Sequence, residues 1–421
     1  MMRPARWIVM VVAMAAAVVA AALGIAPGGT QRPAADEVAT DLDRSERVER
    51  GRYLARVGDC AGCHTAPGGE PMAGGFALES PYGTFHVPNI TPDAETGIGD
   101  WSRRQFRDAL LRGRRPDGKA LYPACPYPSY TRARARDIDA VFAWLQSLPP
   151  VEHRTRAHDL DFPYGFRPLV NAWQWLFLEP GRLRPAADRS GEWRRGRYLV
   201  EGLGHCNECH RQRGAFGALR ETDAAPGGLV HGWYAPSLAS PDEAGLQGWS
   251  VERAADFLTS GRSRDAVMLG PMAGVVHDSL QHLRSADARA MAAYLREMPR
   301  REVAPDEAWR QPPKRRIEPM MKQGARMYGE QCADCHGEDG RGEPGVVSLA
   351  GNRTVTQRNP ANVVRMIRRG GFPASTPGNP YPHGMPPFQQ LSDPEIAALA
   401  TYIRRSWGND ATAVSTIGMP E

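Results

Sequence analysis

The pattern Cys-x-x-Cys-His occurs three times in this chain of 421 residues. On one helical turn, cysteines three positions apart lie on the same face, and the histidine that follows joins them. This pattern is the sequence signature of covalent c-type haem attachment, in which two thiols tether the porphyrin and an imidazole reaches the iron. The predicted attachment residues are Cys60, Cys63, Cys206, Cys209, Cys332 and Cys335, and the predicted iron ligands are His64, His210 and His336. The chain is therefore predicted to carry three covalently bound haem c groups.

Zinc binding is the alternative, because Cys-x-x-Cys pairs also hold structural zinc. Each pair here is followed at once by histidine and lies more than a hundred residues from the next pair, and both features favour haem. The chain has 7 cysteines, of which the motifs use all but Cys125. A disulfide framework would take cysteines away from a haem.

The length predicts several domains. After removal of an N-terminal export segment about 390 residues remain, which matches three domains of about 130 residues each. One haem per domain follows. The predicted division is a first domain at 45–160, an aromatic linker at 161–188, a second domain at 189–303 and a third domain at 316–410.

An uncharged run, Trp7–Ala26, follows Arg3 and Arg6 at the N-terminus. A positive region before an apolar stretch is typical of a secretory signal peptide, and about 20 residues also suffice for a membrane anchor. The segment is therefore predicted to be a signal peptide or an N-terminal membrane anchor. Both alternatives place the haem domains in the periplasm, in association with the inner membrane.

The formal net charge of +5 does not predict nucleic-acid binding. Each haem adds two propionate carboxylates, so three haems would bring the loaded protein close to neutrality. The chain also contains 37 prolines and 44 glycines. This composition favours short helices joined by extended loops and gives no support for a sizeable sheet.

The sequence repeats itself around the motifs. Gly51–Leu54, Gly196–Leu199 and Gly324–Tyr328 each precede one motif and predict a short helix that leads into it. The first two repeats share more, because a Trp-Ser pair lies 12 residues before a glycine in both. These pairs are Trp101-Ser102 before Gly113 and Trp249-Ser250 before Gly261.

Each repeat is predicted to close with an amphipathic helix, at Asp137–Leu148, Ala286–Met298 and Asp393–Trp407. Ser285 and Ser392 are predicted N-caps, and Ser392 to Glu395 has the capping-box pattern. A helix, a haem motif, loops, a sixth ligand and a closing helix resemble the layout of a class I cytochrome c domain. The resemblance implies a mainly α fold of three tandem class I cytochrome c domains, each with short helices around one covalent haem.

A haem that only transfers electrons commonly takes a methionine thioether as its second axial ligand. Met272 lies 62 residues after His210, and Met385 lies 49 residues after His336. Both stand in Pro/Gly-rich segments that are predicted to be loops, so both are candidate iron ligands. The alternative is that they fill gaps in the core, which methionine often does.

The equivalent position in the first repeat, 61 residues after His64, is Cys125. A thiolate donates more electron density than a thioether, so ligation by Cys125 would lower the potential of the first haem. The alternatives are a buried, inert thiol, ligation by Met72 or His86, and a five-coordinate haem.

Five stretches of the chain are similar to one family of proteins. They are Asn89–Asp93, Thr96–Gly99, Leu121–Tyr127, Tyr198–Cys206 and Ser406–Asn409. They resemble the three-haem cytochrome c subunits of bacterial membrane-bound alcohol, gluconate, sorbitol and aldehyde dehydrogenases, and the similarity runs from about residue 45 to 410.

The resemblance implies that a catalytic subunit supplies the electrons, as a quinoprotein, a flavoprotein or a molybdenum hydroxylase. It implies ubiquinone or a terminal oxidase as the acceptor. Many members of the family have Met or Phe where this chain has Cys125, so the first haem is the point of departure. The chain also ends 12 residues after Asn409. Membrane attachment is therefore expected through the N-terminal segment or a partner.

Two surface features have two interpretations each. The aromatic linker either packs the domains together or faces the dehydrogenase or the membrane interface, where aromatic residues are enriched. Its aromatic residues are Phe162, Tyr164, Phe166, Trp173, Trp175 and Phe177. A basic cluster is either a solvated helix face or a docking site for an acidic partner. Its members are Arg103, Arg104, Arg107, Arg112, Arg114 and Arg115.

The predicted function is electron transfer as the non-catalytic subunit of a dehydrogenase complex. The sequence contains no dinucleotide-binding fingerprint and no nucleophile signature. A self-standing haem enzyme that oxidises thiosulfate or reduces peroxide is the alternative, with Cys125 as its only support. A redox sensor or quinone-binding module is a further alternative, which would not need three haems.

Overall fold

The computed structural model describes residues 42–181, 183–220, 226–302, 311–416 and 419. The predicted export segment, Trp7–Ala26, lies outside these residues. Within the described ranges, every helix is too short or too polar to span a lipid bilayer.

The chain divides into two compact units. Unit 1 contains the described residues up to 185 together with 201–205 and 215–218, and unit 2 contains the remaining described residues. The first motif lies in unit 1, and both of the others lie in unit 2. Apart from 201–205 and 215–218, the described residues of the predicted domains at 189–303 and 316–410 thus fall into one unit, and the division into three domains stays a prediction.

Unit 1 consists mainly of short helices. They are α2 (Arg44–Val57), α3 (Cys60–His64), α4 (Arg103–Arg112), α5 (Tyr127–Tyr130), α6 (Ala135–Leu145) and α7 (Pro168–Phe177). A small antiparallel sheet has the strand order β1-β2-β3, and in register Leu78 pairs with Phe85 and Thr84 with Asp159. Its strands are β1 (Ala77–Ser80), β2 (Gly83–His86) and β3 (Asp159–Leu160).

Unit 2 is also mainly helical. Its helices are α8 (Gly191–Tyr198), α9 (Asn207–His210), α10 (Val251–Ser260), α11 (Pro271–Asp278), the 3-10 turn η2 (Leu280–His282), α12 (Ser285–Arg296), α13 (Lys314–Gln331), α14 (Ala333–His336), α15 (Arg353–Thr356), α16 (Ala361–Arg369) and α17 (Asp393–Arg405). Helix α8 continues into the π-helical turn η1 (Leu199–Leu203), whose last three residues belong to unit 1. Its strands form two antiparallel pairs, β4 (Gly228–Val230) with β5 (Trp233–Ala235), and β6 (Arg262–Ser263) with β7 (Ala266–Val267). In the described residues, these two-stranded pairs and the small sheet of unit 1 agree with the expectation that the fold contains no sizeable sheet.

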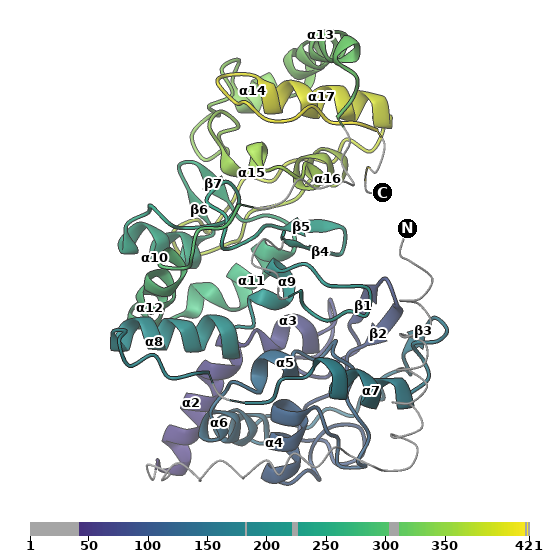
Figure 1. Ribbon diagram of the computed structural model, residues 1–421, viewed down its shortest axis with the longest axis vertical. Helices are drawn as coiled ribbons and strands as arrows, with labels where there is room; N and C mark the ends of the chain where they lie inside the picture. The colour runs from purple at the N-terminus through teal and green to yellow at the C-terminus, as the bar shows by residue number, and fades with distance from the viewer. Residues whose placement is uncertain (1–41, 182, 221–225, 303–310, 417–418, 420–421) are drawn as a thin grey trace, which may run out of the picture. The chain divides into compact units, whose positions relative to one another are not determined.

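The helix before each motif crosses the helix that closes the same repeat, which pairs α2 with α6, α8 with α12 and α13 with α17. Figure 1 shows the last two crossings within unit 2. A glycine permits each crossing, because a Cβ atom there would overlap a carbonyl oxygen of the facing helix. The glycine and carbonyl residues, with the Cβ–oxygen distance that would result, are Gly51 and Ala140 at 1.8 Å, Gly196 and Ala290 at 1.8 Å, and Gly324 and Ala398 at 2.4 Å. The repeated glycine is thus a packing requirement.

An ion pair fixes this crossing in the first two repeats. Arg50 donates to Asp137 at 2.6 Å, and Arg195 donates to Asp287 at 2.8 Å. Both arginines directly precede the crossing glycine, and both aspartates lie within the closing helix. Gln323 stands at the corresponding position before the third motif.

The shared Trp-Ser register corresponds to one capped helix in each repeat. Ser102 caps α4 in a capping box with Gln105, and Ser250 caps α10 through the amide of Arg253. The glycines 12 residues after the tryptophans end these helices in the left-handed conformation, with φ of 61° and 72°. The shared register of these two segments is confirmed.

The closing helices lie close to their predicted positions. Ser392 and Glu395 form the predicted capping box of α17, in which the side chain of each accepts from the backbone amide of the other. The predicted cap at Ser285 is wrong, because α12 begins at Ser285 and its N-cap is Arg284. Arg284 already has extended backbone angles there, so the serine falls inside the first turn.

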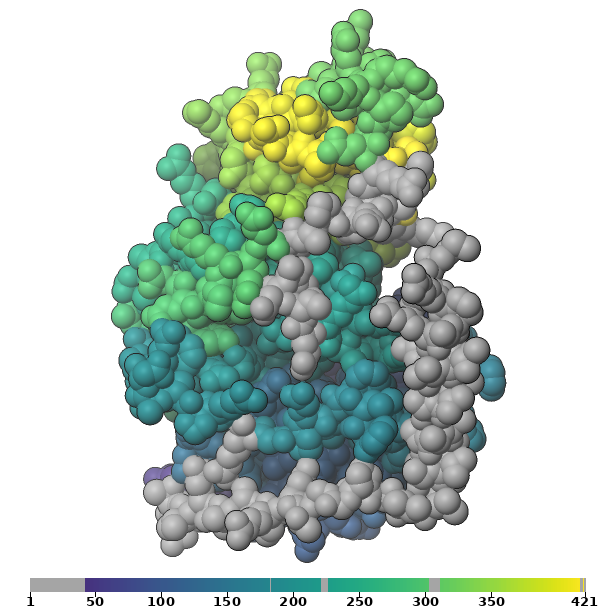
Figure 2. Space-filling view, in the orientation of Figure 1, coloured from purple at the N-terminus to yellow at the C-terminus, as the bar shows by residue number. Residues whose placement is uncertain are grey.

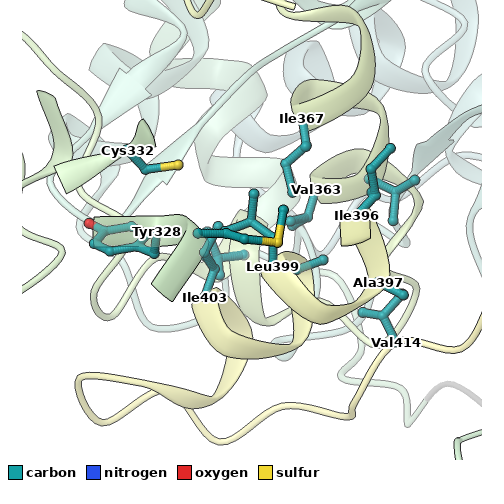
Figure 3. Packing of buried hydrophobic residues seen from close by; sticks show 13 residues of the cluster. Tyr328, Cys332, Val363, Ile367, Ile396, Ala397, Leu399, Ile403 and Val414 are labelled. Carbon is teal, nitrogen blue, oxygen red and sulfur yellow. The ribbon is translucent and has the colours of Figure 1, made fainter. Parts of the chain in front are cut away.

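The core around the third motif is built from α13, α16 and α17 (Figure 3). Its buried side chains are Met327, Tyr328, Cys332, Val355, Val363, Val364, Ile367, Ile396, Ala397, Leu399, Ala400, Ile403 and Val414. In the space-filling view, green atoms of the α13 segment and yellow atoms of the C-terminal segment lie against one another (Figure 2). This core holds the first cysteine of the third motif in an apolar environment.

Candidate haem-attachment sites

The three motif histidines share one arrangement: the Nδ1 atom of each lies within hydrogen-bonding distance of a backbone carbonyl. The pairs are His64 and Pro88 at 2.8 Å, His210 and Pro236 at 2.7 Å, and His336 and Val347 at 3.2 Å. An Nδ1–H that donates to a carbonyl fixes the tautomer and leaves Nε2 as the metal-binding nitrogen. Burial also lowers the pKa of each of these imidazoles. They are therefore neutral near pH 7, as iron ligation requires.

The cysteines of each motif stand on or next to one helical turn, as the spacing predicts. In the second and third motifs the histidine amide donates to the carbonyl of the first cysteine, Cys206 at 3.0 Å and Cys332 at 2.9 Å. Burial raises the pKa of Cys60 and of Cys206 to about 12, and that of Cys332 to about 11. No disulfide joins any of the seven cysteines, all of which lie in the described ranges. Burial thus keeps the thiols of Cys60, Cys206 and Cys332 protonated, and a protonated thiol is a poor nucleophile for adventitious disulfide exchange.

A c-type haem suits each of these sites in its donor set: two neighbouring thiols and an imidazole whose Nε2 is free. Over the described part of the chain, no three side chains of His, Cys, Asp or Glu gather into a metal-ion site. In each motif the two cysteines would hold the haem through thioether bonds to its vinyl groups, and the histidine would ligate its iron.

Cys125 lies near the first motif, in the turn before α5. Its backbone is held by two hydrogen bonds, from its own amide to Tyr122 at 3.1 Å and from Tyr127 to its carbonyl at 2.8 Å. The field of Cys125 contributes to the raised pKa of the Cys60 thiol, after burial and the charges of Asp59 and Cys63. The structure thus brings the spare cysteine to the first pair of attachment cysteines.

The two fallback ligands of the first motif have other settings. Met72 is buried, with a φ of 62°, and its amide donates to Thr65 Oγ1 at 3.2 Å. His86 ends β2, and its amide is hydrogen-bonded to His158 Nδ1 at 3.2 Å. Neither contact assigns these side chains to the iron.

Met272 lies in the first turn of α11, so the expectation of a loop is wrong at this position. Gly270 begins that helix with a φ of 55°, and a Cβ atom on it would lie 2.5 Å from the ring of Trp233. Proline at the first helical position explains the helix, because Pro271 needs no amide partner there. Met272 still follows directly on a sharp turn packed against an aromatic ring.

Met385 lies in an extended segment, as predicted. It pairs with Gly371 through two backbone hydrogen bonds of 2.8 and 3.0 Å. Its side chain is partly buried against the core around the third motif. This pairing fixes the methionine next to the C-terminal end of α16.

Sequence reasoning missed the three carbonyl partners of the histidines. Pro88 and Pro236 both follow a β-hairpin closely, so alignment of the first two repeats would have found them. Val347 lies in a loop without an equivalent strand pair, and no sequence signal marks it.

The aromatic linker divides into a buried and an exposed face. In α7 the Gln174 side chain donates to the Gly113 carbonyl at 3.0 Å, and Trp173 donates to the Phe216 carbonyl at 2.7 Å. Phe162, Phe166 and Trp175 are more than half exposed. The linker therefore packs within unit 1 with one face, and its other face is exposed.

Most of the basic cluster has acidic or polar partners within unit 1. Arg107 pairs with Asp139, Arg112 with Asp108 at 3.1 Å, Arg115 with Asp117 at 3.5 Å, and Arg114 donates to Asn171 at 2.8 Å. These pairs support the interpretation of a solvated helix face. Docking of an acidic partner stays a prediction.

Comparison with family models gives two matches. The model described as "Cytochrome c" matches residues 48–149, and the model described as "Cytochrome C oxidase, cbb3-type, subunit III" matches residues 319–403. These spans contain the first and the third motif. The prediction of cytochrome c domains in a mainly helical chain is confirmed.

Comparison with individual proteins gives relatives over most of the chain. "Alcohol dehydrogenase (quinone), cytochrome c subunit" of Gluconobacter oxydans is 37% identical over 396 residues, which cover 89% of this chain and 81% of the relative. "Gluconate 2-dehydrogenase cytochrome c subunit" of Pantoea cypripedii is 34% identical over 90% of each chain. One of the subunits of the nicotinate dehydrogenase of Pseudomonas putida is 39% identical over 87% of this chain, a stretch that spans only 31% of that relative.

Proposed function

We propose, since this chain belongs to the family of cytochrome c subunits of alcohol, gluconate, fructose and nicotinate dehydrogenase complexes, that it is a periplasmic tri-haem electron carrier. It takes electrons from a dehydrogenase catalytic subunit and passes them to ubiquinone or the respiratory chain. The threefold arrangement of a cysteine pair with a carbonyl-oriented histidine carries this proposal.

Haem c, when bound, supplies one-electron chemistry, since its iron alternates between the ferric and ferrous states. The protein contributes the surroundings. Two cysteines in each motif tether the ring, and the carbonyls of Pro88, Pro236 and Val347 hold the histidines in one tautomer. A ligand held in this way does not reorganise when an electron arrives.

The sixth ligands set how strongly each site attracts an electron. Met272 and Met385 would supply thioethers to the second and third haem, which raise the potential. Cys125 would supply a thiolate to the first haem, which lowers it. The first haem would then hold electrons least strongly and pass them onward most readily.

Replacement of the spare thiol tests this assignment. Cys125→Met is expected to raise the reduction potential of one haem, because a thioether lacks the negative charge that a thiolate provides. Redox titration followed by low-temperature EPR measures the change. Cys125→Ser is the control, since it removes the thiol without supplying a thioether. Identical titrations of wild type and Cys125→Met would assign Cys125 to packing alone.

The location is part of the proposal. The run Trp7–Ala26 supports export as a signal peptide or an N-terminal anchor, so the haem domains lie in the periplasm at the inner membrane. The exposed aromatic side chains of the linker provide an apolar surface toward the catalytic subunit or the membrane.

Deletion of this chain from its own host tests the function. Membranes should then lose substrate-driven reduction of ubiquinone, while the catalytic subunit still reduces an artificial dye. The panel of substrates is ethanol, gluconate, fructose and nicotinate, which the relatives' names suggest. Loss of dye reduction, or turnover of thiosulfate or peroxide by the purified chain, would contradict an electron-carrier role.

A further inference from the structure

Arg365 is a buried cation whose charge the described residues leave unbalanced. It lies in α16 with 9% of its surface exposed, and its Nε atom has no hydrogen-bond partner among the residues described. Burial lowers the pKa of its guanidinium, and the like charges of Arg369 and Arg368 lower that pKa further. A buried charge is costly unless an opposite charge or hydrogen bonds compensate it.

A second buried arginine in the same region shows the usual solution. Arg404 is fully buried, and the protein satisfies its guanidinium with the Val355 carbonyl at 2.6 Å and with two oxygens of Thr412 at 3.1 Å. Arg365 has no such set of carbonyls. Its missing partner is therefore expected to be a group that binds the folded chain.

The guanidinium of Arg365 lies against the tip of the β4–β5 hairpin. A Cβ atom on Gly232, at that tip, would lie 1.9 Å from its Nη2 atom. One helical turn earlier, Asn362 exchanges two hydrogen bonds of 2.8 Å with the backbone of Tyr234. The same face of α16 thus holds the hairpin and presents the cation to it.

This hairpin forms part of the second attachment site. Strand β5 runs directly into Pro236, whose carbonyl holds the Nδ1 atom of His210 at 2.7 Å. The ring of Trp233 packs on Gly270, two residues before Met272. Arg365, which comes from the segment between the third motif and its closing helix, is therefore placed at the site of the second motif.

We propose that Arg365 binds a propionate carboxylate of the haem attached at Cys206 and Cys209. Guanidinium and carboxylate form a strong ion pair that is often joined by two hydrogen bonds, and haem provides two such carboxylates. The positive charge also favours the reduced iron, because reduction adds a negative charge nearby. Arg365 thus tunes the second haem from the neighbouring part of unit 2. The inference rests on the proposed haem at the second motif.

The test compares Arg365→Met, Arg365→Lys and wild type in the full-length, haem-loaded protein. Potentiometric titration with optical and EPR detection gives the potential of each haem. In Arg365→Met we expect the ferric-to-ferrous ratio of the second haem at a fixed potential to rise about tenfold, a downward shift of about 59 mV for one electron. Arg365→Lys keeps the charge and should shift the potential less.

Arg368→Met is the matched control, since it removes a like charge from the same helix that is already paired with Asp393. It should leave the second haem unchanged. The titration step absent from a Cys206→Ser, Cys209→Ser variant identifies the second haem, and Met272→His provides an independent assignment if that variant does not fold.

The outcomes separate the two proposals. A haem count below three in wild type would overturn the proposed function itself. With three haems present, an unchanged potential in Arg365→Met, a shift confined to the third haem, or an equal shift in Arg368→Met would overturn the role of Arg365.

Discussion

Replacement of both cysteines of one motif is expected to remove one haem from the chain and no other. In Cys206→Ser, Cys209→Ser the second site loses both thioether tethers, so the haem count should fall from three to two. The region around α8 and α12 should also lose stability, because a haem-sized apolar group no longer fills its core. A haem count per chain from the pyridine haemochrome spectrum, together with intact mass, measures the loss.

Cys125→Ser is the control for this experiment. Cys125 is the one cysteine outside the motifs, so its replacement should leave three covalent haems in place. Three haems in the double variant would contradict the assignment of the motif, and two haems in Cys125→Ser would give that thiol an attachment role.

Gly324→Ala is expected to disrupt the crossing of α13 and α17. The added Cβ atom would lie 2.4 Å from the Ala398 carbonyl oxygen and 2.6 Å from Tyr402 Cβ, so the two helices must separate. Overpacking of this kind costs about 1–3 kcal/mol of unfolding free energy. The helices carry the core around the third motif, so the third haem should also become less tightly enclosed. Denaturant unfolding followed by tryptophan fluorescence and haem absorbance measures the effect.

Gly329→Ala provides the comparison within the same helix. A Cβ atom at Gly329 meets nothing within 4 Å, and alanine favours helix over glycine by about 1 kcal/mol. This variant should therefore be slightly more stable than wild type. Equal destabilisation by both substitutions would contradict the helix crossing as the cause of the effect at Gly324, because a Cβ atom at Gly329 meets no neighbouring atom.

The regular parts of the fold could be predicted because the sequence repeats them. The Gly-Arg-Tyr segments predict the helices before the motifs, and the structure explains the glycine by the carbonyl that faces it. The Trp-Ser pairs mark helices that run from a serine cap to a left-handed glycine. Such signals lie within a short stretch of sequence, so they can be interpreted without knowledge of the tertiary structure. The ends of helices are less certain, as the misplaced cap at Ser285 shows.

Of the candidate sites, the sequence could predict only the residues of the Cys-x-x-Cys-His motifs. Local spacing reveals the cysteines and histidines, but the carbonyl that orients each histidine comes from a distant loop. Pro88 lies 24 residues from His64, and Val347 lies 11 residues from His336. Met272 was expected in a loop, whereas Pro271 begins a helix there. The buried state of Arg365 depends on contacts more than a hundred residues away, and its sequence neighbours Arg368 and Arg369 look the same.

The measurement that tests the central claim most directly is the intact mass of the purified chain after maturation in a host that attaches c-type haem. The account predicts the mass of the polypeptide plus three haems, with haem on the peptides that contain Cys60, Cys206 and Cys332. A mass with two haems or fewer would contradict a tri-haem carrier, and the peptide that lacks haem would show which motif does not function as an attachment site.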